Sequence, residues 1–195
     1  METVTPNTED IKRALTTLLR AIGEDPDREG LRGTPDRIMR MWKEIFRGYD
    51  PERAPKITTF SNRKGFTGMV FDTGDFYSMC EHHVLPFFGQ YYFAYIPTAE
   101  GRILGISKVA RVVGYCTARL QLQERLARDI VDMLSEALDG TAAGMAILLK
   151  GRHLCKSMRG VKNDGKMTVT RFTGCFDSDP TLRDEFYRII SLQEK

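Results

Sequence analysis

Histidine is scarce in this sequence, which has three such residues in a chain of 195. Hydrophobic runs are short as well, and none approaches the roughly 18 residues that a membrane-spanning helix needs. Residues 1–10 are polar and acidic, so they lack the basic start and the apolar middle of a secretory signal peptide. We therefore expect a cytoplasmic protein that has no membrane partner.

Charge of a single sign is also in short supply. The sequence has 29 lysines and arginines against 26 acidic residues, a net charge of +3, and it contains no Lys/Arg block. This balance argues against a nucleic-acid partner and favours local phosphate-binding positions over a basic surface. The four cysteines suit a reducing compartment better than a disulfide framework.

The three histidines are not scattered, because each lies within three residues of a cysteine in segment 80–83 (Cys-Glu-His-His) or segment 153–155 (His-Leu-Cys). Thiolate and imidazole are the ligands that zinc prefers. The spacing Cys80-x-x-His83 lets one turn present a sulfur and a nitrogen to the same ion, and Cys155 would be the third ligand. The sequence therefore predicts a zinc site built from two distant segments.

Two kinds of zinc site remain open on these residues. A structural site normally closes with four protein ligands, whereas a hydrolytic site keeps three and leaves the fourth position to water. His82 and His153 are left over as neighbours that could move protons, which favours the hydrolytic kind. The alternative is a closed structural site in which His153 or Cys116 completes the ligand set.

The N-terminal part of the chain has the periodicity of two helices. Apolar residues recur at helical spacing through 11–22, and Gly23 ends that pattern. Thr34 and Pro35 are expected as the N-cap and first residue of a second helix that ends before Gly48.

A segment with two prolines, residues 49–56, marks the expected domain boundary. We expect an N-terminal helical region and linker at 1–55 and a catalytic domain with a C-terminal helix at 56–195. The domain's elements are expected as strands at 66–77, broken at Gly74, and 87–96, helices at 107–116 and 122–137, strands at 145–149 and 167–173, and a helix from 179. This β-β-α-α-β-β order predicts an α+β fold with two helices on one face of an antiparallel sheet.

Four motifs, in this order, resemble the GTP cyclohydrolase I family: residues 78–83, 105–111, 121–126 and 153–160. The resemblance runs from about Thr8 to Ile190. It implies the tunnelling fold, in which such subunits form a pentameric barrel and two rings stack as a homodecamer.

The resemblance also implies a reaction, in which GTP and water give 7,8-dihydroneopterin triphosphate and formate as the first step toward folate or pterin cofactors. Zinc (Zn2+) would be held by Cys80, His83 and Cys155. The acid/base pair would be His82 and His153. Water activated by the metal would attack C8 of the guanine, and the ribose would then open, rearrange and close again.

Substrate contacts follow from the same resemblance. Glu124 would accept from the guanine N1–H and 2-amino group, Gln123 would add an amide contact, and Ser107 would assist at the ribose. The triphosphate would be bound by four cations, the last from a neighbouring subunit: Lys108, Arg111, Arg159 and Arg37.

Positive residues beside the predicted site depart from the family pattern, namely Lys150, Arg152 and Lys156. We expect them to tune substrate affinity or the pKa of the histidines. Two alternatives to the family reaction remain. One is a hydrolase that acts on another purine nucleotide, and the other is a zinc-stabilised oligomeric binding protein without turnover.

Overall fold

The computed structural model describes residues 7–194, which divide into two compact units, one ending at Arg47 and one beginning at Gly48. The first unit contains helices α1 (Thr8–Ala21) and α2 (Thr34–Ile45). No helix in residues 7–194 combines the length and the apolar character needed to cross a membrane.

The start of α2 differs from the expectation by one residue. Thr34 is the first residue of the helix and Gly33 occupies the N-cap position without a side-chain capping bond. The Thr34 hydroxyl instead accepts a 3.3 Å hydrogen bond from Arg37. The prediction of Thr34 as N-cap is therefore wrong, because its side chain turns toward the helix surface.

The second unit alternates long strands with helices. After a short 3₁₀ turn at Arg47–Tyr49, its elements are η2 (Pro51–Arg53), β1 (Thr59–Ser61), β2 (Val70–Cys80), β3 (Leu85–Pro97), β4 (Arg102–Leu104), α3 (Lys108–Cys116), β5 (Leu120–Gln121), α4 (Gln123–Ala137), β6 (Ala142–His153), α5 (Leu154–Ser157), β7 (Met167–Gly174), α6 (Cys175–Ser178) and α7 (Pro180–Gln193). The long elements follow the predicted β-β-α-α-β-β order.

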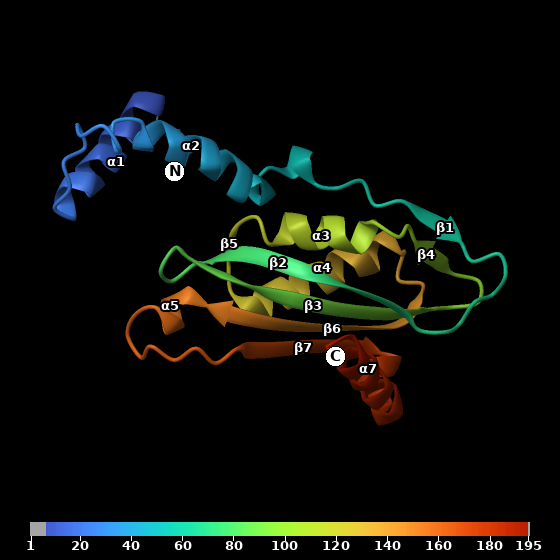
Figure 1. The fold of residues 1–195 in the computed structure, drawn as a ribbon. Coiled ribbons are helices and arrows are strands. Elements are labelled where there is room, and N and C mark those ends of the chain that lie inside the picture. The colour runs from blue at the N-terminus through green and yellow to red at the C-terminus, as the bar shows by residue number, and fades with distance from the viewer. Residues whose placement is uncertain (1–6, 195) are drawn as a thin grey trace, which may run out of the picture. The chain divides into compact units, whose positions relative to one another are not determined.

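The main sheet has the strand order β5-β2-β3-β6-β7, and its long strands are all antiparallel neighbours (Figure 1). The predicted α+β class is confirmed. One pairing was not predicted: the two residues of β5 run parallel to the end of β2, with Cys80 opposite Gln121. This short strand brings the beginning of α4 beside the end of β2.

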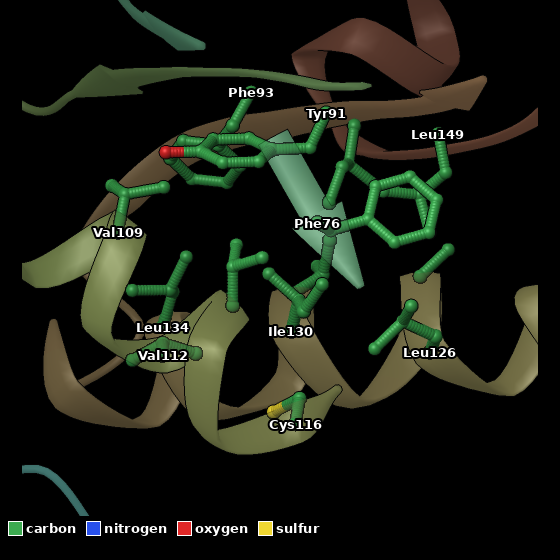
Figure 2. Close-up of a cluster of buried hydrophobic side chains, with 14 of the residues drawn as sticks. Phe76, Tyr91, Phe93, Val109, Val112, Cys116, Leu126, Ile130, Leu134 and Leu149 are labelled. Carbon is green, nitrogen blue, oxygen red and sulfur yellow. The ribbon is translucent and has the colours of Figure 1, made fainter. Parts of the chain in front are cut away.

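Helices cover both faces of the sheet (Figure 1). Helices α3 and α4 pack on one face over a large apolar core, where Val109, Ile130 and Leu134 meet Tyr91 and Phe93 (Figure 2). Helices α6 and α7 contribute to a second apolar cluster on the other face. The expectation of two helices on one face is thus correct for α3 and α4, and α7 adds cover that the sequence did not predict.

Strand β2 does not break at Gly74. It pairs with β3 along its whole length, with Gly74 opposite Tyr91. A Cβ atom at position 74 would lie 2.9 Å from the Tyr91 ring, so the missing side chain makes room for that tyrosine. The predicted interruption is wrong because this glycine serves packing across the sheet.

Candidate metal centre and active site

The two cysteine-containing segments meet at one end of the sheet. Cys80 is the last residue of β2, and Cys155 lies in α5, directly after β6. Their sulfur atoms are 3.8 Å apart, and the Cys155 sulfur is 4.0 Å from Nδ1 of His153. The possible ligand atoms of Cys80, His153 and Cys155 all lie within 4.8 Å of one another. This group could hold a metal ion.

The spacing of the thiols fits zinc. Two sulfurs bound at about 2.3 Å to a tetrahedral zinc ion lie about 3.8 Å from each other, which is the separation of Cys80 and Cys155. Burial raises the pKa of the Cys155 thiol, and the neighbouring Cys80 raises it further. Because metals bind the thiolate form, ion binding here would release protons and depend on pH.

His153 is fixed on two sides. Its ring stacks on Phe87, the residue opposite it on β3, with centroids 4.5 Å apart and planes 6° from parallel. Its Nε2 lies 2.9 Å from the side-chain oxygen of Gln123. Burial is the main cause of the lowered pKa of His153, with a further contribution from Lys156, whereas the charge of Glu124 acts in the opposite direction.

The hydrogen bonds of Gln123 determine the tautomer of His153. The Gln123 side-chain nitrogen donates to the carbonyls of Leu149 and Met167, at 2.9 and 3.0 Å. Its oxygen is therefore an acceptor, and Nε2 of neutral His153 must carry the proton. Nδ1 is then the bare nitrogen, and it faces the Cys155 sulfur.

The Gln123 side chain is engaged within the chain, and the substrate contact that the resemblance implied stays a prediction. The side chain is 1% exposed, and its amide is occupied by two carbonyls and by His153. A Cβ at Gly151 would lie 2.7 Å from the Gln123 oxygen, so a glycine between Lys150 and Arg152 is needed for this close packing. Within the chain, Gln123 fixes the orientation of the His153 ring.

His82 and His83 lie in the turn between β2 and β3, where both are exposed. Nε2 of His83 is 3.0 Å from the Arg159 guanidinium. The charge of Arg159 also acts to lower the pKa of Cys155, against the larger effect of burial. Within the described part of the chain, His83 lies outside the group of three possible ligands, and His153 is in it.

The remaining predicted residues fall into separate places. Glu124 is exposed in the first turn of α4, next to Gln123. Ser107 is the N-cap of α3 but makes no capping bond through its side chain. Arg37 belongs to the N-terminal unit, where it donates to the Gly30 carbonyl at 3.0 Å.

The start of α3, which carries Ser107, Lys108 and Arg111, lies far from the thiols within one chain. The preceding strand β4 is tied to the Val70 end of β2, because the Leu104 amide donates to the hydroxyl of Tyr95, the residue opposite Val70. Cys80 is ten residues further along the same strand. At about 3.3 Å per residue, the two ends of β2 are roughly 30 Å apart, and α3 begins near the end opposite the thiols.

The unusual cations are paired. Lys150 contacts Glu194 at 2.7 Å, and Arg152 forms an ion pair with Asp164. Residues alternate between faces along a strand, so both point away from the face that carries His153. Of the three, Lys156 acts on His153, whose pKa its charge lowers.

Three residues that fix the geometry of this site were missed in the sequence. Phe87 was assigned to a strand, and its place opposite His153 follows only from the register. Gln121 and Arg125 were quoted within a motif, although their bonds to each other and to Glu81 depend on the parallel pairing of β5. No periodicity in the sequence indicates that pairing.

Comparisons with known proteins agree with the resemblance. The family model described as GTP cyclohydrolase I matches residues 11–191. A protein named GTP cyclohydrolase 1 from Caldanaerobacter subterraneus is 46% identical over 94% of this chain and 96% of its own length. One of the same name from Aquifex aeolicus is 42% identical over 93% of this chain and 96% of its own.

Among solved structures, the archaeosine synthase QueF-Like in the apo form matches 54% of this chain and 93% of its own, with 18% identity and a TM-score of 0.43.

Proposed function

The chain belongs to the GTP cyclohydrolase I family of hydrolases, and we propose that it converts GTP and water to 7,8-dihydroneopterin triphosphate and formate with a zinc ion. This reaction begins pterin biosynthesis. The observation that carries the metal is the 3.8 Å separation of the Cys80 and Cys155 sulfurs, which matches two ligands of one tetrahedral zinc.

Zinc, when bound, supplies a Lewis acid that makes water a nucleophile near neutral pH. We propose that Cys80, Cys155 and His83 hold it. His83 follows Cys80 in the same turn, and the charge of its partner Arg159 acts on the pKa of Cys155. The alternative third ligand is His153, whose Nδ1 already faces the sulfurs.

With His83 as ligand, His153 is left to move protons beside the metal. Its bare Nδ1 can accept a proton, and its lowered pKa keeps that nitrogen unprotonated near neutral pH. Held by Phe87 and Gln123, the ring needs no reorientation for this step. His82 is the proposed second proton carrier, on the exposed side.

Glu124 is the proposed guanine contact. Its carboxylate is exposed in the first turn of α4, and it is close enough to His153 for its charge to act on that residue's pKa. A carboxylate accepts two parallel N–H bonds, as the N1–H and 2-amino group of guanine require. Gln123 would support this contact indirectly, by holding His153.

We further propose that the active site is shared between copies in a ring of the tunnelling-fold type, with a homodecamer as the expected assembly. The start of α3 near the Val70 end of β2, opposite the end that carries Cys80, supports this. Ser107, Lys108 and Arg111 would then act on the ribose and triphosphate bound at the next copy's metal. Arg159 from the metal-bearing copy and Arg37 from a further copy would complete the phosphate contacts.

The thiol chemistry also supports the proposed cytoplasmic location, where the free cysteines stay reduced.

Incubation of the zinc-loaded protein with GTP tests the function directly. We expect formate and, after oxidation, a fluorescent pterin. Turnover of another purine nucleotide in place of GTP would favour the first alternative, and zinc binding without turnover of any nucleotide would favour the second.

Complementation between inactive variants tests the shared site. Cys80→Ala and Lys108→Ala each disable one group of the site, and both should be inactive alone. Mixed copies contain some sites with neither change if the two residues come from different copies, so the mixture should regain activity. No recovery in confirmed mixed oligomers would place both groups in one chain.

A further inference from the structure

Glu81, the residue after Cys80, is held at both its backbone and its side chain. Its amide donates to the Gln121 carbonyl at 3.2 Å, which extends the parallel pairing of β2 with β5 by one residue. Its carboxylate accepts a hydrogen bond from the Arg125 guanidinium, and both side chains are about one third exposed. The turn that carries His82 and His83 is therefore anchored at its first residue.

The Arg125 side chain is itself held by hydrogen bonds to the segment before α4. Its Nε donates to the side-chain oxygen of Gln121 at 2.8 Å, and its Nη2 donates to the Leu120 carbonyl at 3.1 Å. The planar guanidinium thus has a set orientation before it reaches Glu81. A lysine, which has a single charged nitrogen, could not reproduce this set of contacts.

Gln121 cannot rotate to release Arg125. It is 1% exposed, and its side-chain nitrogen donates to the Cys116 carbonyl and to Asp129, both at 3.1 Å. Its oxygen must therefore point to Arg125, since a flipped amide would turn its oxygen toward the Cys116 carbonyl and Asp129, which are both acceptors. The contact between Arg125 and Glu81 rests on a buried and fully bonded amide.

Three consecutive residues at the start of α4 thus have different tasks. Gln123 holds His153 at the end of β6, and Arg125 holds Glu81 in the metal-binding turn. Glu124 lies between them with its side chain exposed. The position of this carboxylate relative to the thiols is therefore set through both neighbours.

We infer that the Arg125–Glu81 pair is a positioning device, which holds the turn with the metal ligands at a fixed distance from the carboxylate of Glu124. This inference rests on the proposed function. The ligand that it selects is a purine base long enough to reach from the metal to that carboxylate. Neither Arg125 nor Glu81 needs to touch the substrate.

The direction in which two substitutions change zinc affinity distinguishes a positioning effect from a charge effect. If only charge acted, Arg125→Met would strengthen zinc binding by removing a cation, and Glu81→Ala would weaken it by removing an anion. Positioning predicts that both weaken zinc binding, by about 10- to 100-fold, as is typical of residues that orient metal ligands. In the double variant the effects should not add, because either change alone already releases the turn.

Zinc affinity is measured by competition with a chromophoric chelator, with folding checked by circular dichroism. The matched control is the pair Arg171–Asp132, which also joins α4 to a strand, with 2.9 Å between the charged atoms. Arg171→Met and Asp132→Ala should leave zinc affinity unchanged. For a milder change that preserves charge, Arg125→Lys should fold and still weaken zinc binding.

Turnover at saturating zinc supplies the second measurement. We expect kcat/KM for GTP to stay low in Arg125→Lys even when the metal site is full, because the distance to Glu124 remains wrong. Opposite signs for Arg125→Met and Glu81→Ala, or unchanged zinc affinity in all variants, would overturn the inference. The proposed function fails separately, if the wild-type protein with zinc produces no formate from GTP.

Discussion

His153, two residues before Cys155, and His83, three residues after Cys80, flank the same thiol pair, yet they are held in different ways. His153 stacks on Phe87 and bonds to a buried amide that is fixed by two carbonyls. His83 is exposed and contacts the side chain of Arg159, which is exposed as well. The β6 side is thus held by buried contacts, whereas the side-chain contacts of the turn, those of Glu81 and His83, are partly or fully exposed.

This difference suggests a division of tasks. A group that takes and returns a proton works best in a fixed geometry, which fits His153. A ligand that closes around an incoming ion has to exchange one partner for another, which fits His83 and its exposed contact with Arg159.

A disulfide between Cys80 and Cys155 should have the largest effect on zinc binding. The Cys80 and Cys155 sulfurs need to approach by only roughly 2 Å to form a disulfide. We expect protein treated with a chelator and then exposed to air to form this bond and to lose zinc binding completely until a reductant is added. Peptide mapping with thiol labelling checks it.

The other cysteines are the internal control for that experiment. Cys116 is buried, and burial raises its pKa to about 12, which keeps it in the unreactive thiol form. Cys116 and Cys175 should stay free, and zinc-loaded protein should be protected. A bond to either of these residues would mean that Cys80 and Cys155 do not share one metal.

Removal of an imidazole from either side tests the proton carriers. His153→Ala and His82→Ala should each lower turnover by about 10²- to 10⁴-fold while zinc remains bound. Zinc content by atomic absorption, together with formate release, measures both. Cys80→Ala is the comparison, and it should lose the metal itself. If His153→Ala empties the site as completely as Cys80→Ala does, His153 is a ligand.

Much of the fold follows from local patterns in the sequence. The helical periodicity and the capping residue Asp179, whose side chain accepts from the Thr181 amide, were enough to predict α7. Strand β5 could not be predicted, because two residues carry no periodicity and their pairing depends on where β2 ends. The break expected at Gly74 failed for a similar reason, since the role of that glycine depends on Tyr91 across the sheet.

The site divides in the same way. Clustering of histidine and cysteine indicated a metal site, and the structure brings Cys80, His153 and Cys155 together. The sequence could not indicate which ring nitrogen faces the sulfurs, because that follows from the hydrogen bonds of Gln123. Nor could it show that Ser107 lies at the other end of the sheet, which depends on tertiary contacts of β4.

Removing the side chain that holds His153 should lower turnover less than removing the His153 imidazole itself. Gln123→Leu deletes the acceptor for His153 and leaves the Leu149 and Met167 carbonyls without this donor. We expect turnover per folded molecule to fall by about 10- to 100-fold. The free energy of unfolding should fall by about 1–3 kcal/mol, as measured by urea denaturation.

Asn62→Leu is the matched control for this change. Asn62 is another buried amide, and its nitrogen donates to the carbonyls of Phe66 and Thr98 at 2.7 and 2.8 Å, in the loop that precedes β2. It should cost similar stability and leave turnover per folded molecule unchanged. Equal losses of turnover in both variants would mean that Gln123 acts through stability alone.

The smallest expected effect concerns the exposed partner on the turn side. The Arg159 guanidinium is always a donor, so Nε2 of His83 is the acceptor in their 3.0 Å contact. Zinc at Nε2 would displace Arg159 directly. Zinc at Nδ1 would require a proton on Nε2, which could then no longer accept. In both cases Arg159 competes with zinc for His83.

Arg159→Met should therefore strengthen zinc binding by about 2- to 10-fold, the equivalent of one hydrogen bond worth about 0.5–1.5 kcal/mol. Removing any nearby positive charge also favours binding of Zn2+. Lys156→Met measures this charge effect alone, because the charge of Lys156 also acts on the site, at His153. Arg159→Met in a His83→Ala background completes a double-mutant cycle. If Arg159→Met gains as much there as in the wild type, its effect does not pass through His83. His153, whose Nδ1 already faces the thiols, would then be the third ligand.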